Sequence, residues 1–391
     1  MQKHGLSFWY AAAFMFGAIQ LVALPILIPS HILSVSGSMV HVGAALSFVG
    51  LSGFVAPLIG STIDRLKLHS AAQKGALVLY AIAMALFAYV PQTWSMYLAT
   101  FLVGLGSITL MTVNPTFIVA AGFDQEEQAL KLTRMNQSIF VGAIVMGAIF
   151  AVAEGFSETL SFGMVCGLSI VSILIVSVDS KLSAQRITSE APQEEVGEVK
   201  GRWNLTFVTF LLAVFVAMLA SSNQVAQGPN LFESLFNIDK SATALLLSIS
   251  SVISLLTLDI AGRALGKYGA GKVWIVGLTG YIVVGAALSN LLTGGVDYFY
   301  LPLVMHLLFM QCLSMVDMVK PAIVAKVTTM TPAATQGFLL FAIAGGYAAG
   351  TTLGGVVGEL AGMSSLFVFV AASATIALLF AMFTLARIED N

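Results

Sequence analysis

The placement of the basic residues constrains this chain most strongly. Its 391 residues contain only 17 Lys and Arg, and nearly all lie in polar intervals between long apolar runs. They gather in every second interval, and only Lys240 and Lys320 fall outside this alternation. Such one-sided placement is the positive-inside pattern of multi-pass membrane proteins. It predicts a protein of the bacterial inner (plasma) membrane with both termini in the cytoplasm.

The composition agrees with a membrane protein. Hydrophobic residues make up 58% of the chain and charged residues 9%, far from the values of a soluble domain. A net charge of −2 offers no basic surface for nucleic acid. Cys166 and Cys312 lie inside apolar runs, so we expect neither a disulfide framework nor a thiolate metal site. The first apolar run is too long for a signal peptide, and we interpret it as the first span.

Twelve apolar runs have the length needed to cross a membrane. A helix requires about 20 apolar residues to span a hydrocarbon core about 30 Å thick. The runs lie near 7–29, 41–60, 72–90, 95–121, 132–153, 159–178, 204–226, 241–261, 272–292, 298–325, 335–358 and 363–386. We therefore predict an all-α integral membrane protein with twelve transmembrane helices. The predicted division is an N-terminal six-helix bundle at 1–178, a polar cytoplasmic linker at 179–203 and a C-terminal six-helix bundle at 204–391.

The two predicted bundles repeat each other. Three landmarks recur at offsets of 204, 202 and 206 residues: a glutamine five residues before a proline, a loop glycine, and a polar residue directly before a proline. The paired landmarks are Gln20 with Gln224, Gly60 with Gly262, and Asn114 with Lys320. Internal duplication in a membrane protein is typical of transporters whose substrate site lies between the halves.

One loop motif makes the resemblance specific. The segment Gly60-Ser-Thr-Ile-Asp64-Arg65 resembles the G-x-x-x-D-R start of the loop signature of the major facilitator superfamily, and 262–269 resembles its degenerate second copy. The next signature glycine is replaced by Lys67. The compact length and short loops resemble bacterial efflux proteins of this superfamily. Thr100 stands where the drug:proton antiporter branch carries an arginine, so the chain is not a clear match to that branch.

The resemblance implies a gate at the cytoplasmic ends of the helices. Asp64 and Arg65, with Gly60, would form this gate by meeting a neighbouring helix N-terminus in one access state. Asp259 and Arg263 lie four residues apart at the equivalent position of the second half, a spacing that suits an ion pair. The alternative for all five residues is plain anchoring at the membrane interface.

The tenth apolar run is chemically unusual because it contains His306, Gln311, Asp317 and Lys320. At 100° per residue, the histidine, the aspartate and the lysine share one helix face, which we expect to face the central cavity. An ionisable group in the middle of a membrane is costly, which favours a role in function. Asp317 and Lys320 are spaced to neutralise each other. The alternative is that Lys320 extends to the inner interface with Asp317 as its structural partner.

Side-chain amides supply the remaining candidate substrate contacts. Amides both donate and accept hydrogen bonds, which suits hydroxyl, carboxylate or amide groups of a solute. The alternative is hydrogen bonding between helices. The candidate substrate-binding residues are Gln20, Asn114, Gln137, Asn223, Gln224, Gln227 and Gln311.

These patterns predict a secondary active transporter that moves a small organic solute by alternating access. We expect proton-coupled efflux, with Asp317 and His306 as the candidates for carrying the proton, and a monomer that interacts with solute, protons and lipid. One alternative is a uniporter or exchanger of an organic anion held by Lys320. Another is a receptor or assembly factor on the same fold.

We do not expect an enzyme, a cofactor or a metal. The sequence shows no nucleophile with a base at a recognisable spacing and no cluster with metal-ligand spacing. It also lacks a G-x-x-x-x-G-K-[ST] run, so ATP is not the expected energy source.

Overall fold

The computed structural model describes residues 8–119, 125–152, 156–190, 203–293, 300–328 and 332–389. Within these ranges every regular element is a helix. Twelve helical segments are long and apolar enough to cross a membrane, by length and composition, which confirms the expected number of spans. The chain is therefore an all-α, multi-pass membrane protein. An even number of crossings places the two ends of the chain on one side of the membrane, which we call the terminus side, and we call the other the far side.

The N-terminal half contains the first six spans. Its elements are α1 (Tyr10–Ala18), η1 (Ile19–Ala23), α2 (Leu24–Ile26), α3 (Ile28–Ser36), α4 (Met39–Leu51), η2 (Ser52–Val55), α5 (Ala56–Leu66), α6 (His69–Tyr89), α7 (Thr93–Val119), α8 (Gln125–Val152) and α9 (Glu158–Glu190). The sixth candidate span ends at Val178, and α9 continues as a helix to Glu190, into the segment expected to be a linker.

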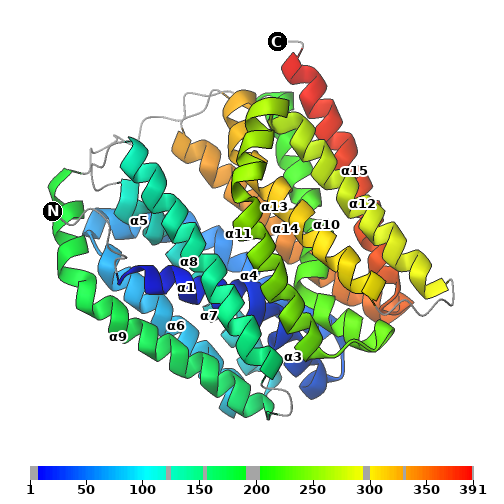
Figure 1. Cartoon of the computed structure of the whole chain (residues 1–391), viewed down its shortest axis with the longest axis horizontal. Coiled ribbons are helices and arrows are strands. Elements are labelled where there is room, and N and C mark those ends of the chain that lie inside the picture. The colour runs from blue at the N-terminus through cyan, green and yellow to red at the C-terminus, as the bar shows by residue number, and fades with distance from the viewer. Residues whose placement is uncertain are drawn as a thin grey trace.

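The C-terminal half contains the other six spans, one to a helix. They are α10 (Leu205–Phe236), α11 (Lys240–Tyr268), α12 (Ala270–Thr293), α13 (Tyr300–Val327), α14 (Pro332–Ala361) and α15 (Ser365–Glu389). Figure 1 shows the two halves side by side, with the N-terminal half in blue to green and the C-terminal half in green to red.

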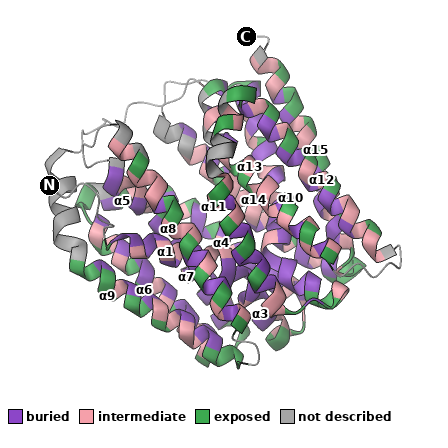
Figure 2. Ribbon diagram, viewed as in Figure 1, coloured by how far each residue is buried: buried purple, intermediate pink, exposed green. Residues whose placement is uncertain are grey.

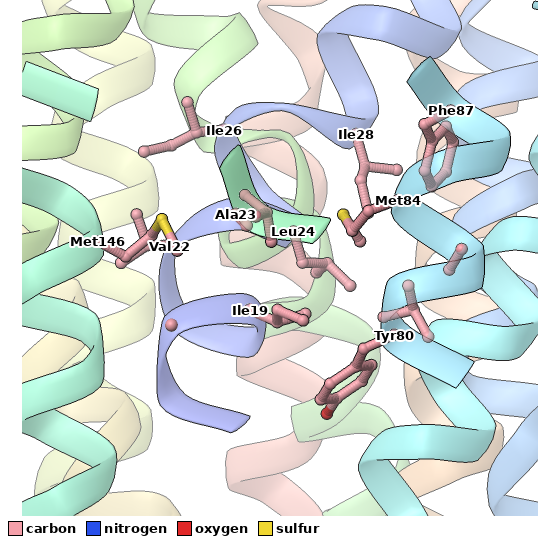
Figure 3. Packing of buried hydrophobic residues seen from close by; sticks show 14 of the residues in the cluster. Ile19, Val22, Ala23, Leu24, Ile26, Ile28, Tyr80, Met84, Phe87 and Met146 are labelled. Atoms are coloured by element: carbon pink, nitrogen blue, oxygen red, sulfur yellow. The ribbon is translucent and has the colours of Figure 1, made fainter. Parts of the chain in front are cut away.

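Prolines explain why the first span is broken into pieces. Pro25 and Pro29 have no backbone N–H, so the carbonyls one turn before them lose their helical partners. The chain responds with a wider π turn over Ile19–Ala23, a feature that is frequent at functional sites. Figure 3 shows this segment inside the N-terminal half, where Ile19 and Leu24 pack near Tyr80 of α6.

Each half has its own apolar core. In the C-terminal half the rings of Tyr281 and Phe309 stack with their centroids 4.6 Å apart, and Trp274 is fully buried beside Phe210. The outer helices α12 and α15 carry many exposed positions (green in Figure 2), and most of the large side chains exposed there are apolar, as expected for contact with lipid.

The two halves meet mainly through two helix pairs, α4 with α14 and α8 with α11. The contacts of the second span with α14 begin at the far side. They extend to η2, where the ring of Phe54 lies 4.7 Å from the ring of Phe341. In the second pair the Ser248 hydroxyl donates to the Ile144 carbonyl at 3.2 Å. By contrast α5, which continues the second span toward the terminus side, packs mainly on α7 of its own half. The halves are thus closed together at the far side.

Candidate functional site

A buried polar stretch on α10 is the most unusual feature of the membrane interior. Asn223, Gln224, Gln227 and Asn230 are each at most 4% exposed in the middle of an apolar helix. Pro229 lies among them and leaves the carbonyl one turn earlier without its helical partner. Buried amides need hydrogen-bond partners, so their surroundings indicate what this region can bind.

His306 of α13 is the partner of Gln224. The Nδ1 atom of His306 lies 3.0 Å from the Nε2 atom of Gln224, and the imidazole is 1% exposed. The Phe232 ring packs edge-on against the imidazole at a centroid distance of 5.0 Å. Asn223 donates from Nδ2 to the Gly350 carbonyl of α14 at 2.8 Å. Three spans of the C-terminal half, the seventh, tenth and eleventh, are therefore joined here.

This cluster retains unused hydrogen-bonding capacity. Of the nine buried polar side-chain atoms without a partner in the described part of the chain, three belong to this cluster: His306 Nε2, Gln227 Oε1 and Asn230 Nδ2. An unpartnered buried polar group is costly, and functional sites are where such groups are tolerated. The cluster can thus offer both donors and acceptors to a polar solute. Asn230, three residues after Gln227 on the same helix, was not among the sequence candidates.

The N-terminal half contains a matching arrangement. Gln20, in the π turn of the first span, donates from Nε2 to the hydroxyl of Ser107 on α7. The Tyr80 hydroxyl lies 2.8 Å from the same serine hydroxyl. In each half, then, the glutamine of the repeated Gln–Pro landmark is bonded to the fourth helix of that half. The sequence repeat predicted equivalent glutamines but not their partners.

Asp317 and Lys320 form the expected ion pair. Lys320 Nζ lies 2.5 Å from Asp317 Oδ1 and 3.3 Å from the sulfur of Met218 on α10. The lysine side chain is 4% exposed and the aspartate side chain 52%. The sequence led us to expect that His306, Asp317 and Lys320 share one helix face toward the central cavity, and this stays a prediction. His306 and Lys320 are buried against α10, and Asp317 alone among them is exposed in this conformation.

The other candidate amides lie apart from the α10 cluster. Gln311 donates to the hydroxyls of Ser250 and Ser254 on α11, at 3.3 Å each. Asn114 is buried and accepts from Gln73 Nε2 at 2.7 Å, which is a bond between helices of the kind weighed as the alternative. Gln137 of α8 is exposed.

At the terminus side the signature loop is only partly described. Gly60 lies in α5 and is partly buried, and Arg65 and Arg263 are exposed. The side chains of Asp64 and Asp259 lie outside the described residues. Lys67 has a φ of 54°, a left-handed conformation that glycine adopts most easily. The lysine that replaces the expected signature glycine thus lies at a position where glycine would be less strained.

A charged cavity lies at the far side, between the halves. Its volume is about 240 Å³, and its polar lining comes from both halves: Ser30, Glu158 and Ser161 from one, and Glu233, Asp239, Lys240 and Ser241 from the other. Glu158 pairs with His31 at 2.7 Å, and Lys240 pairs with Glu233 at 3.7 Å. Sequence reasoning did not identify these groups as a site, because they come from four helices, and one connection between helices, that are distant along the chain.

No protein-family model and no curated protein matches the sequence. Solved structures do match the fold. The nucleoside transporter NupG has a TM-score of 0.74 at 16% identity, covering 97% of this chain and 98% of that chain, and a mutant of NupG has a TM-score of 0.76. The D-xylose-proton symporter has a TM-score of 0.69 at 14% identity, covering 96% of this chain and 95% of that chain. The chain has the fold of the major facilitator superfamily, as the loop motif and the repeat predicted.

Proposed function

We propose that this protein is a secondary transporter that moves a small polar organic solute across the bacterial inner membrane by alternating access. The observation that carries the proposal is the buried, incompletely bonded cluster around Gln224 and His306. It lies in a two-part helical fold whose halves meet at the far side. With both termini in the cytoplasm, as the basic residues predict, this conformation would be closed to the outside.

The proposed solute is neutral and rich in hydroxyl or amide groups. The cluster offers amide oxygens, amide N–H groups and an imidazole, and no charge. NupG and the D-xylose symporter are named for a nucleoside and a sugar, solutes of this chemistry. The alternative of an organic anion held by Lys320 is less well supported, because Lys320 is buried and already paired with Asp317.

Asp317 is the proposed site of proton coupling. It is the exposed member of its ion pair, so it can exchange protons with water while Lys320 stays buried. Protonation of the carboxylate would leave the buried ammonium without its counter-charge, which is strongly unfavourable in a membrane interior. The helix would then be driven to rearrange against α10, where Lys320 contacts Met218. In this way the gain of a proton is linked to movement of a helix that also carries His306.

Two directions of coupling remain candidates. Efflux is the direction expected from the sequence, and symport is favoured by the fold shared with a sugar–proton symporter. In proteoliposomes with an acidic exterior, symport would accumulate solute inside and antiport would drive preloaded solute out. Screening a metabolite pool in this assay identifies the solute and the direction together. Absence of any solute movement by protein that is folded and correctly inserted would instead favour a receptor or assembly factor.

The matched variants are Asp317→Asn and the double variant Asp317→Asn with Lys320→Met. The single variant leaves a buried, unpaired lysine, so we expect it to lose transport. The double variant removes both charges, and we expect it to regain exchange down a solute gradient without accumulation driven by a pH gradient. Full pH-driven accumulation by the double variant would show that the pair is only structural.

A further inference from the structure

One carboxylate crosses from the C-terminal half to the start of a helix in the N-terminal half. Glu359, near the end of α14, accepts from the Ser38 hydroxyl at 2.6 Å and from the Val40 backbone N–H at 3.1 Å. Ser38 is the N-cap residue of α4, and Val40 lies in its first turn. These contacts lie at the far side, where the second span begins and the eleventh ends.

Helix α4 relies on this carboxylate because its own cap is not used. The first N–H groups of a helix have no partner within the helix, and a serine at the N-cap usually accepts from one of them. Here the Ser38 side chain makes no capping bond to α4. Its hydroxyl instead donates to Glu359, and the same carboxylate oxygen receives the N–H of Val40. A negative charge in this place also interacts favourably with the helix dipole.

Next to the contact of Glu359 with α4, the backbones of α4 and α14 pack closely against each other across the two halves. A Cβ added at Gly355 of α14 would lie 2.5 Å from the Met39 carbonyl, and one added at Gly43 of α4 would lie 2.2 Å from the Thr351 carbonyl. The two backbones therefore approach as closely as glycine allows. The Met39 side chain, 6% exposed, packs in the core of the C-terminal half. Separation of the halves at the far side would remove this packing and the cap together.

We propose that Glu359 acts as a latch, by which we mean a contact that stabilises the closed arrangement of the two halves at the far side. It caps α4 only while the two halves are closed, so opening the far side leaves the first turn of α4 without its acceptor. The latch adds a stabilising contact to the closed state that the open state lacks. This inference rests on the proposed alternating access, and it assigns to Glu359 a role in setting the ratio of closed to open molecules rather than in binding solute.

Distances between spin labels test the latch without any solute. One pair, Val35→Cys with Ser364→Cys, reports on the far side, and a second pair, Leu68→Cys with Lys326→Cys, reports on the terminus side. For Glu359→Ala in lipid nanodiscs we expect a larger population with a long far-side distance and a short terminus-side distance. The expected change in the ratio of closed to open molecules is roughly three- to tenfold, typical of a helix cap.

Two further variants separate the latch from general damage. Glu359→Gln keeps the size of the side chain and one acceptor oxygen, so we expect an effect smaller than that of alanine, and it gives a measurement even if the alanine variant does not fold. Asp239→Ala is the matched control, because Asp239 caps α11 entirely within the C-terminal half by accepting the Ala242 N–H at 2.7 Å. We expect Asp239→Ala to leave both distances unchanged.

The latch and the proposed transport can fail separately. Unchanged far-side distances in folded Glu359→Ala and Glu359→Gln protein would overturn the latch, whatever the protein transports. An equal shift in Asp239→Ala would also overturn it, because the effect would then belong to any lost cap. A shift confined to the Glu359 variants, in a protein that moves no solute, would support the latch and contradict the transport proposal.

Discussion

Gln224 and His306 are bonded across α10 and α13, with Nε2 and Nδ1 3.0 Å apart in a region closed to solvent. An amide nitrogen can only donate, so Nδ1 must accept and the imidazole proton must lie on Nε2. That Nε2 atom has no partner within the described residues. The glutamine thus sets the tautomer of the histidine, and the remaining imidazole N–H is available as a donor to the proposed solute.

Replacement of His306 by alanine should weaken solute binding. It removes the proposed donor and leaves the Gln224 amide unpaired, a loss of about 1–3 kcal/mol. This corresponds to roughly a 5- to 150-fold rise in the KM for solute exchange. Proteoliposome counterflow, which needs no pH gradient, measures the KM. His41→Ala is the control, because His41 bonds to Tyr97 of the N-terminal half instead, and an equal rise in both variants would contradict the assignment.

Gly355→Ala should hold the far side open. Its methyl group would meet the Met39 backbone, which cannot move aside without shifting α4. The far-side label distance should lengthen, and transport should fall at least tenfold if closure is required in every cycle. Gly358→Ala, one turn further along α14, is the control because its methyl would make only ordinary contacts, the nearest atom lying at 3.5 Å. A far-side distance that stays short in Gly355→Ala would show that the helices can adjust.

Gly142→Ala should destabilise the N-terminal half itself. Helices α1 and α8 approach so closely that a Cβ at Gly142 would lie 1.9 Å from the Phe14 carbonyl. Adding a methyl group to a well-packed core typically costs about 1–3 kcal/mol. We expect a lower thermal unfolding midpoint in detergent and lower expression. Gly167→Ala in α9 is the matched control, since a Cβ there meets nothing within 4 Å, and equal midpoints for the two variants would contradict the prediction.

The sequence predicted much of this fold because the membrane limits the solutions. Apolar length determines the spans, and the placement of basic residues determines their direction, so the twelve spans followed without knowledge of any contact. The pairing of Asp317 with Lys320 also followed, because residues three apart are neighbours on any helix. The number of spans and this ion pair are therefore confirmed, and the direction of the spans stays a prediction.

Contacts between distant spans were not predictable in the same way. The partner of Gln224 depends on how α10 and α13 are rotated about their axes, and helices surrounded by lipid and by other apolar helices give weak periodic signals. Glu359 stands six residues before Ser365, where the next span begins, and resembles an ordinary interfacial charge. Its role as a cap appears only when the far sides of the two halves are closed together.

The C-terminal half has one charged and one neutral N-cap residue. Comparing them separates the contribution of charge to helix capping from that of the hydrogen bond. Asp239 caps α11, and its carboxylate also accepts from the Ser241 hydroxyl at 2.8 Å. The Ala242 backbone N–H, and then the Ser241 hydroxyl, lower the pKa of this carboxyl below its usual value. Asn204 caps α10 in the same way, accepting the Phe207 N–H at 2.6 Å without a charge.

Asp239→Ala and Asn204→Ala should each lower the free energy of unfolding by about 0.5–2 kcal/mol at neutral pH. Their pH dependence should differ. Because the folded-state pKa of Asp239 is lowered, its stabilisation is complete above the usual value of about 3.9 and is lost as the pH falls through the lowered value. Thermal unfolding at pH 7 and at pH values below 4 should therefore show the Asp239→Ala difference shrinking with acid, while the Asn204→Ala difference persists. A pH-independent Asp239→Ala difference would show that the carboxyl caps the helix equally well when protonated.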